Sequence, residues 1–183
     1  WMHVAETIRS RTGLTAPATQ IAAAMFEYWN GAVSEVRAIP GAPEAIRAAA
    51  AARLKIGVVS SSPRSVIDHF LTRLGVSDYV SPDARIGAES VRVGKPDPEG
   101  FLLAARALGV APAETLVFED SVAGLLAARA AGMRSMFVTC VATDIAENSA
   151  RATANITDYK ALPPRFWDQL AAGTMPLAGR AFP

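Results

Sequence analysis

The pattern of the chain changes at Ile39-Pro40-Gly41, and this change constrains the fold more than any other feature. Beyond it, short apolar runs rich in β-branched residues alternate with helical patterns, whereas the stretch before it contains helical patterns alone. Strands that alternate with helices are typical of βα units around a parallel sheet. We therefore predict an α/β fold with a Rossmann-like parallel sheet from residue 39, preceded by a purely helical segment.

Three apolar runs are the predicted strands of this sheet, and they cover residues 54–59, 115–118 and 135–139. The first run ends in a serine-rich loop. We predict that Ser62 caps the following helix and that Pro63 is its first residue, because serine is favoured at the N-cap and proline at the first helical position.

The expected domain organisation has three parts: a helical segment over residues 1–38, the α/β core over 39–160, and a C-terminal helix and tail over 161–183. Trp1 is not a translation start, and the residues after it already follow a helical pattern. We therefore expect the natural chain to continue upstream of Trp1.

Charge and cysteine content narrow the possible partners. The chain has 18 basic and 17 acidic residues, a net charge of +1, so it presents no broad field for nucleic acid or an anionic membrane. No apolar run approaches the ~20 residues of a membrane span. Cys140 is the single cysteine, which excludes an intrachain disulfide and suits a reducing, cytoplasmic location. The oligomeric state stays open.

Polar residues follow two of the predicted strands. Ser60 comes after the first strand, and Glu119 and Asp120 end the second. In open α/β sheets, ligands bind at the carboxyl ends of the strands, so these groups could share one crevice. The Ser60 hydroxyl and the amides at the start of the next helix would suit a phosphate group, although a simple turn serine is the alternative.

Charged groups near these strand ends suggest phosphoryl chemistry. Lys95 lies between Gly94 and Pro96, and a cation there could hold a phosphate oxygen, although a solvated surface lysine is the alternative. The adjacent carboxylates of Glu119 and Asp120 repel each other, and a hard cation such as Mg²⁺ would relieve that repulsion. Compensation of the helix dipole is the alternative reading of the acid pair.

Three strings of the sequence, taken in order, resemble the second, third and fourth motifs of the haloacid dehalogenase superfamily: VVSSSP, GKPDP, and LVFEDSVAG followed by AARAAGM. Their order and spacing make the resemblance specific, and it covers residues 39–160. The helical segment resembles the second half of the cap in sugar-phosphate phosphatases and β-phosphoglucomutases. The resemblance therefore implies a core of this superfamily with a partial helical cap.

The resemblance also implies roles for individual residues. Ser60 and Lys95 would be catalytic, and Ser60, Ser61 and Lys95 would bind the phosphoryl group. Asp120 would ligate Mg²⁺, with Glu119 beside it as a ligand or as a partner of a metal-bound water. Ser121 and Gly124 would shape the loop. Apart from the resemblance, the position of Arg64 just after the serine loop makes it a candidate to support the site through contact with substrate or cap, and a surface charge is the alternative.

The first motif of the superfamily, an Asp-x-Asp pair that supplies the nucleophile and the acid–base residue, is absent from the 183 residues. The resemblance implies that this pair ends a strand upstream of Trp1. That strand would be the central one of the sheet, between the strands at 54–59 and 115–118. Without it, two buried strand edges would lack partners, so we expect the 183 residues alone to be unstable or rearranged.

Three hypotheses about function remain open. The first is a Mg²⁺-dependent phosphatase that acts on a small phosphorylated metabolite, most simply a sugar phosphate, through an aspartyl-phosphate. The second is a mutase that returns the phosphate to the sugar. The third is a catalytically inactive fragment or pseudoenzyme. A receiver domain is excluded because there the acid pair precedes the hydroxyl and the lysine, whereas here it follows both.

Overall fold

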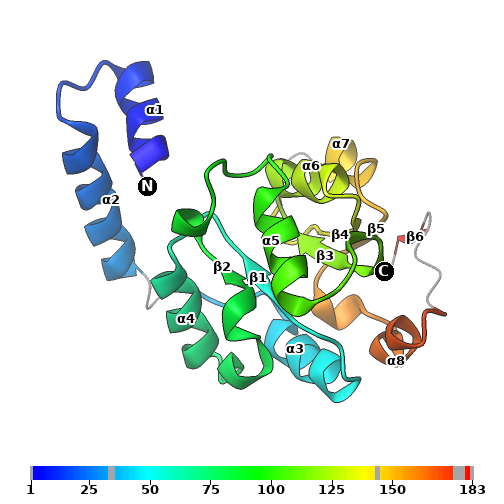
Figure 1. Ribbon diagram of the computed structural model, residues 1–183. Helices are drawn as coiled ribbons and strands as arrows, with labels where there is room; N and C mark the ends of the chain where they lie inside the picture. The colour runs from blue at the N-terminus through cyan, green and yellow to red at the C-terminus, as the bar shows by residue number, and fades with distance from the viewer. Residues whose placement is uncertain (1, 33–35, 143–144, 175–179, 182–183) are drawn as a thin grey trace. The chain divides into compact units, whose positions relative to one another are not determined.

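The computed structural model describes residues 2–32, 36–142, 145–174 and 180–181 (Figure 1). Contacts within the chain divide it into two units, Trp1–Arg37 and Ala38–Pro183.

The first unit is helical, as predicted. Helix α1 (Met2–Thr12) and helix α2 (Ala18–Ala32) pack against each other, with Ala5 and Ala22 buried. Small side chains at these positions allow the two backbones to approach closely. The described part of this unit contains no strand.

The second unit contains parallel strands and helices, which confirms the predicted α/β class. Its α-helices are α3 (Ala42–Ala51), α4 (Arg64–Arg73), α5 (Glu99–Leu108), α6 (Val122–Ala130), α7 (Ile145–Ser149) and α8 (Phe166–Ala171). Its 3₁₀ helices are η2 (Ser77–Tyr79), η3 (Pro82–Ala84), η4 (Ala88–Ser90), η5 (Pro112–Glu114) and η6 (Tyr159–Ala161).

The strands form two separate parallel sheets. In the first, β1 (Val58–Val59) pairs with β2 (Arg85–Ile86). The second has the order β3 (Leu116–Glu119), β4 (Arg134–Val138), β5 (Ala154–Ile156) and β6 (Arg180–Ala181). Every pairing is parallel.

Each sheet has an outer strand with one edge that lacks a ladder among the described residues. The Ser60 amide donates to the Ile86 carbonyl, so the backbone groups of Val59 face the side of β1 away from β2. In the other sheet, β3 pairs with β4 alone. We expected that β1 and β3 would flank a missing strand and would not pair with each other. In the structure, the two strands lie in different sheets.

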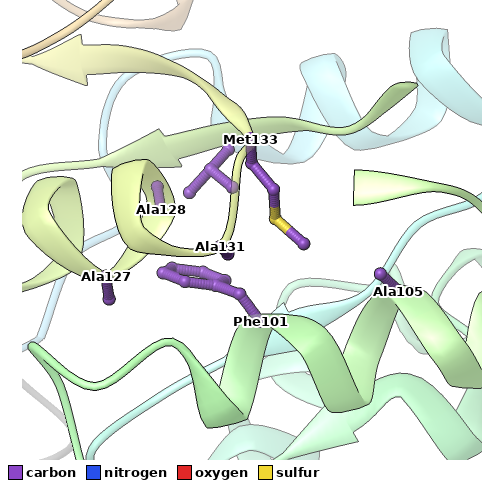
Figure 2. Packing of buried hydrophobic residues seen from close by; sticks show 7 residues of the cluster. Phe101, Ala105, Ala127, Ala128, Ala131 and Met133 are labelled. Atoms are coloured by element: carbon purple, nitrogen blue, oxygen red, sulfur yellow. The ribbon is translucent and has the colours of Figure 1, made fainter. Parts of the chain in front are cut away.

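A buried apolar cluster lies between β3, α5 and α6 (Figure 2). The ring of Phe101 points from α5 toward Ala127 and Ala128 of α6. Val117 of β3 belongs to the same cluster. Val59 of β1 packs against the same cluster. Strands β1 and β3 therefore pack against the same apolar cluster.

Three local predictions differ from the structure. Only Val58 and Val59 of the predicted strand 54–59 form a ladder. Strands β2, β5 and β6 are two or three residues long, too short for a hydrophobic period to mark them. Helix α4 has Pro63 rather than Ser62 as its N-cap, because Pro63 keeps an extended backbone with ψ 153°.

Among the described residues, no helix has the length and apolar character to cross a membrane.

Candidate functional site

Ser60 begins the loop that follows β1. Its amide donates to Ile86, and its Oγ accepts a hydrogen bond of 3.0 Å from the Ser62 amide. The neighbouring Ser61 is exposed, and its amide has no hydrogen-bond partner within the described ranges. Because the Ser60 hydroxyl only accepts here, its proton remains available, and the loop offers that O–H and one free N–H to an anion.

Lys95 connects the ends of the two sheets. Its ammonium donates to the Val59 carbonyl at 3.2 Å and forms an ion pair with Glu119. The same Nζ lies 4.9 Å from the centre of the Phe101 ring. The side chain is only 15% exposed, and a cation so enclosed is tolerated because a carboxylate, a carbonyl and a ring face surround it.

Glu119 is the last residue of β3, and it is buried. One carboxylate oxygen contacts Lys95, while the other accepts from the Ser121 hydroxyl at 2.9 Å and from the Asp120 and Ser121 amides at 3.3 Å. Both oxygens therefore have partners. Asp120, one residue later, is exposed, so the two adjacent acids differ in what they can still bind.

Ser121 and Gly124 shape the turn into α6. Ser121 is the N-cap of α6, and its Oγ accepts from the Gly124 amide at 3.1 Å. A Cβ atom placed on Gly124 would overlap the Glu119 carboxylate. Glycine is required here for space, because the carboxylate lies directly over the first turn of the helix.

Arg64 is held by protein groups. Its Nε lies 3.5 Å from Asp68, and its Nη1 donates to the Arg85 carbonyl at 3.5 Å. Its side chain therefore runs along α4 rather than standing free. The side chain remains partly exposed, and its contact with substrate or cap stays a prediction.

Tyr159 is a site residue that sequence reasoning missed. It lies in η6, and its ring centre is 5.3 Å from that of Phe118 on β3. Burial raises the pKa of Tyr159 to about 12, and the charges of Asp120 and Glu119 add to the shift. No motif surrounds this residue, so only the fold reveals that its ring packs on Phe118, the neighbour of Glu119.

The capacity of the site for a metal ion rests on Asp120. Within the described ranges, no group of three His, Cys, Asp or Glu residues could hold a metal by itself. Mg²⁺ often takes only one or two carboxylates and completes its shell with water and substrate phosphate. The exposed Asp120 fits this need, whereas Glu119 could join only by leaving its present partners.

The space beside Glu119 can be tested with Gly124→Ala. We expect this change to lower the free energy of unfolding by about 1–3 kcal/mol, because the added methyl group overpacks the turn. Gly31→Ala in α2 is the control, since a Cβ there meets no atom within 4 Å, and it should stabilise by at most about 1 kcal/mol. Urea unfolding measures both, and equal effects would contradict the assignment.

The burial of Tyr159 predicts a loss of stability in alkali. The unfolded phenol ionises near pH 10 and the folded one near 12, so the free energy of unfolding should fall as pH rises between these values. Tyr159→Phe should remove about 2–3 kcal/mol of that fall. Urea unfolding of both proteins across this range measures the difference, and parallel profiles would be evidence against the shift.

Comparison with known proteins agrees with this geometry. A sequence profile of haloacid dehalogenase-like hydrolases matches residues 10–132. Validoxylamine A 7'-phosphate phosphatase of Streptomyces hygroscopicus subsp. limoneus is 40% identical over 120 residues, which cover 66% of this chain and 54% of the relative. Hexitol phosphatase B of Escherichia coli K12 is 38% identical over 107 residues, 58% of this chain and 47% of the relative.

The chain thus spans about half the length of these curated relatives. Among solved structures, β-phosphoglucomutase from Clostridium difficile aligns with a TM-score of 0.76 at 24% identity, over 94% of this chain and 77% of that one. This likeness shows the fold. With the matching profile and the three motifs of the sequence, it establishes that the chain belongs to the haloacid dehalogenase-like hydrolases.

Proposed function

We propose that this protein is a Mg²⁺-dependent phosphatase that acts on a small phosphorylated sugar through an aspartyl-phosphate. The observation that carries the proposal is the position of Lys95, whose ammonium lies between the end of β1 and the end of β3. Ser60 follows Val59 directly, so a phosphoryl group bound by the serine loop would lie close to a fixed positive charge.

The residues of the chain supply binding and charge stabilisation. In phosphoryl transfer, negative charge spreads over the oxygens of the transferred group, and fixed donors lower the barrier. The Ser60 hydroxyl and the Ser61 amide would donate to two of these oxygens, and Lys95 would offset their charge. Glu119 would keep Lys95 in place, because its carboxylate is anchored by Ser121.

Asp120 would hold Mg²⁺ through its exposed carboxylate. When bound, the ion would neutralise charge on the phosphate and orient it for in-line attack. Glu119 would act on this ion at a distance, as the residue that fixes the turn from which Asp120 projects.

The nucleophile is the part of the proposal that lies outside the 183 residues, since the sequence contains no Asp-x-Asp string. We infer that an upstream strand enters between β1 and β3 and pairs with the two edges that lack a ladder among the described residues. Its first aspartate would attack phosphorus, and the second would protonate the leaving oxygen and then activate water. Both would emerge next to Lys95.

Sugar phosphates are the favoured substrates because the curated relatives are named for them, including a phosphatase of validoxylamine A 7'-phosphate and a hexitol phosphatase. The β-phosphoglucomutase neighbour, at 24% identity, supports the fold and not the mutase reaction. Hydrolysis is therefore favoured over isomerisation, and the two differ in whether inorganic phosphate or a sugar-phosphate isomer accumulates.

Activity of the full-length protein tests the roles of Lys95 and Asp120. With a panel of sugar phosphates and Mg²⁺, we expect Lys95→Ala and Asp120→Asn each to lower kcat/KM by about 10²–10³-fold, because each removes charge stabilisation from the transition state. Lys55→Ala is the matched control, since Lys55 also donates to a backbone carbonyl, that of Leu108, and it should stay near wild type.

Released inorganic phosphate is the measurement, made with Mg²⁺ and again with EDTA. Equal rates in the two conditions would refute the metal assignment. An active Lys95→Ala protein would refute the assignment of the cation, and accumulation of an isomer without phosphate release would favour the mutase.

The proposed upstream strand gives a separate prediction. The coding sequence before Trp1 should contain an apolar run that ends in Asp-x-Asp. The longer protein should be more stable to urea than the 183 residues alone, because the strand would pair two edges that lack a ladder among the described residues. Urea unfolding of the two lengths measures this. A longer protein without the pair would point to a binding module instead of an enzyme.

A further inference from the structure

Helix α4, which follows the serine loop, begins without a capping side chain of its own. Its N-cap is Pro63, which has no side-chain acceptor, and no side chain within the turn bonds to the first amides. The Arg64 amide instead donates to the Glu89 carboxylate at 2.9 Å, across 25 residues of sequence. A distant acid therefore performs the task that local sequence assigns to Ser62.

A second hydrogen bond holds the same two segments together. The Ala88 amide donates to the Ser62 carbonyl at 3.0 Å, and the Ser90 amide closes the η4 turn onto Gly87, also at 3.0 Å. The Ala88–Ser62 and Arg64–Glu89 hydrogen bonds lie on either side of Pro63, which has no N–H to donate. The η4 turn thus forms two hydrogen bonds with the end of the serine loop, one to Ser62 and one to Arg64.

Gly87 allows this close approach. Its φ is −93°, a value open to any residue, so the demand is for space. A Cβ atom on Gly87 would lie 2.5 Å from the Arg64 nitrogen and 2.6 Å from a Glu89 carboxylate oxygen. A side chain at position 87 would therefore collide with the two groups that form the Arg64–Glu89 hydrogen bond.

The contacts of η4 with Ser62 and Arg64 also affect the proposed phosphate-binding groups, because Ser62 is hydrogen-bonded to Ser60 within the same loop. The Ser62 amide donates to the Ser60 Oγ at 3.0 Å, so the position of Ser62 fixes the Ser60 oxygen and directs its proton away from the loop. The Ser60 amide is tied to Ile86, the last residue of β2 before Gly87. One continuous segment, residues 86–90, thus holds the loop from its start to its end.

Glu89 also corrects an expectation about the anion. The sequence suggested that amides at the start of α4 would face a phosphate, but the Arg64 amide is already bound by a carboxylate. This amide is therefore not available to a phosphate.

We propose that Glu89 is a positioning residue that sets the Ser60 loop for phosphate binding through the acceptor it gives to the Arg64 amide. This inference rests on the proposed function. It predicts that the hydrogen-bond acceptor at position 89 matters and its charge does not.

The test is a titration of the full-length protein with inorganic phosphate. Binding is measured from the NMR shifts of the Ser61 and Arg64 amides. Glu89→Ala removes the acceptor, and we expect phosphate affinity to fall about tenfold. Glu89→Gln keeps an oxygen of the same reach without charge and should stay within about threefold of wild type. Glu89→Asp keeps the charge but shortens the reach, so it should weaken binding like Glu89→Ala.

Glu114→Ala is the matched control. Glu114 also accepts from a backbone amide, that of Ala111, at the start of η5, and its loss should leave phosphate affinity unchanged. Circular dichroism verifies that each variant is folded. If Glu89→Ala does not fold, the order of Glu89→Gln and Glu89→Asp still decides between acceptor and charge.

The outcomes separate the two proposals. If wild type gives no saturable shift at Ser61, the phosphate site fails and this inference fails with it. If wild type binds phosphate and Glu89→Ala binds it equally, or Glu89→Asp exceeds Glu89→Gln, the phosphate site stands and the positioning role is overturned. The expected order, with Glu89→Gln near wild type and the other two weaker, supports it.

Discussion

The ion pair between Lys95 and Glu119 is the interaction on which the rest of the site depends. Each partner is enclosed and would be costly to leave alone, so the two must be placed together. Because Lys95 also binds the Val59 carbonyl, the pair links the ends of two sheets that share no ladder among the described residues. The surrounding sequence serves it: Gly124 makes room for the carboxylate, and Ser121 fixes its orientation.

Carboxylates also hold the two loops that carry the binding groups. Glu89 accepts from the amide that begins α4, and Glu99 accepts from the amides of Val93 and Arg92, just before the Lys95 turn. These hydrogen bonds, that of Val93 first, hold the pKa of Glu99 below its ordinary value. Acids outside the motifs thus hold the loops that carry the motif residues Ser60 and Lys95.

The sequence predicted the parts of the site that depend on local order. Ser60, Glu119 and Asp120 lie at the ends of predicted strands, so each could be located from its neighbours. Glu89 and Tyr159 could not, because their contacts join segments tens of residues apart and leave no periodic or motif signal. Strand β2 was not predicted for a similar reason. Its two residues lie in a polar stretch and form a strand only because they pair with β1.

The fates of the two adjacent acids follow from the same geometry. The sequence suggested that Glu119 and Asp120 repel each other and that a metal ion relieves the repulsion. In the fold, Lys95 already offsets the charge of Glu119, and Ser121 takes up its second oxygen. One carboxylate, that of Asp120, is left exposed and without such compensation. A cation at this site would therefore be coordinated by one protein carboxylate, that of Asp120, and by the negatively charged oxygens of the bound phosphate.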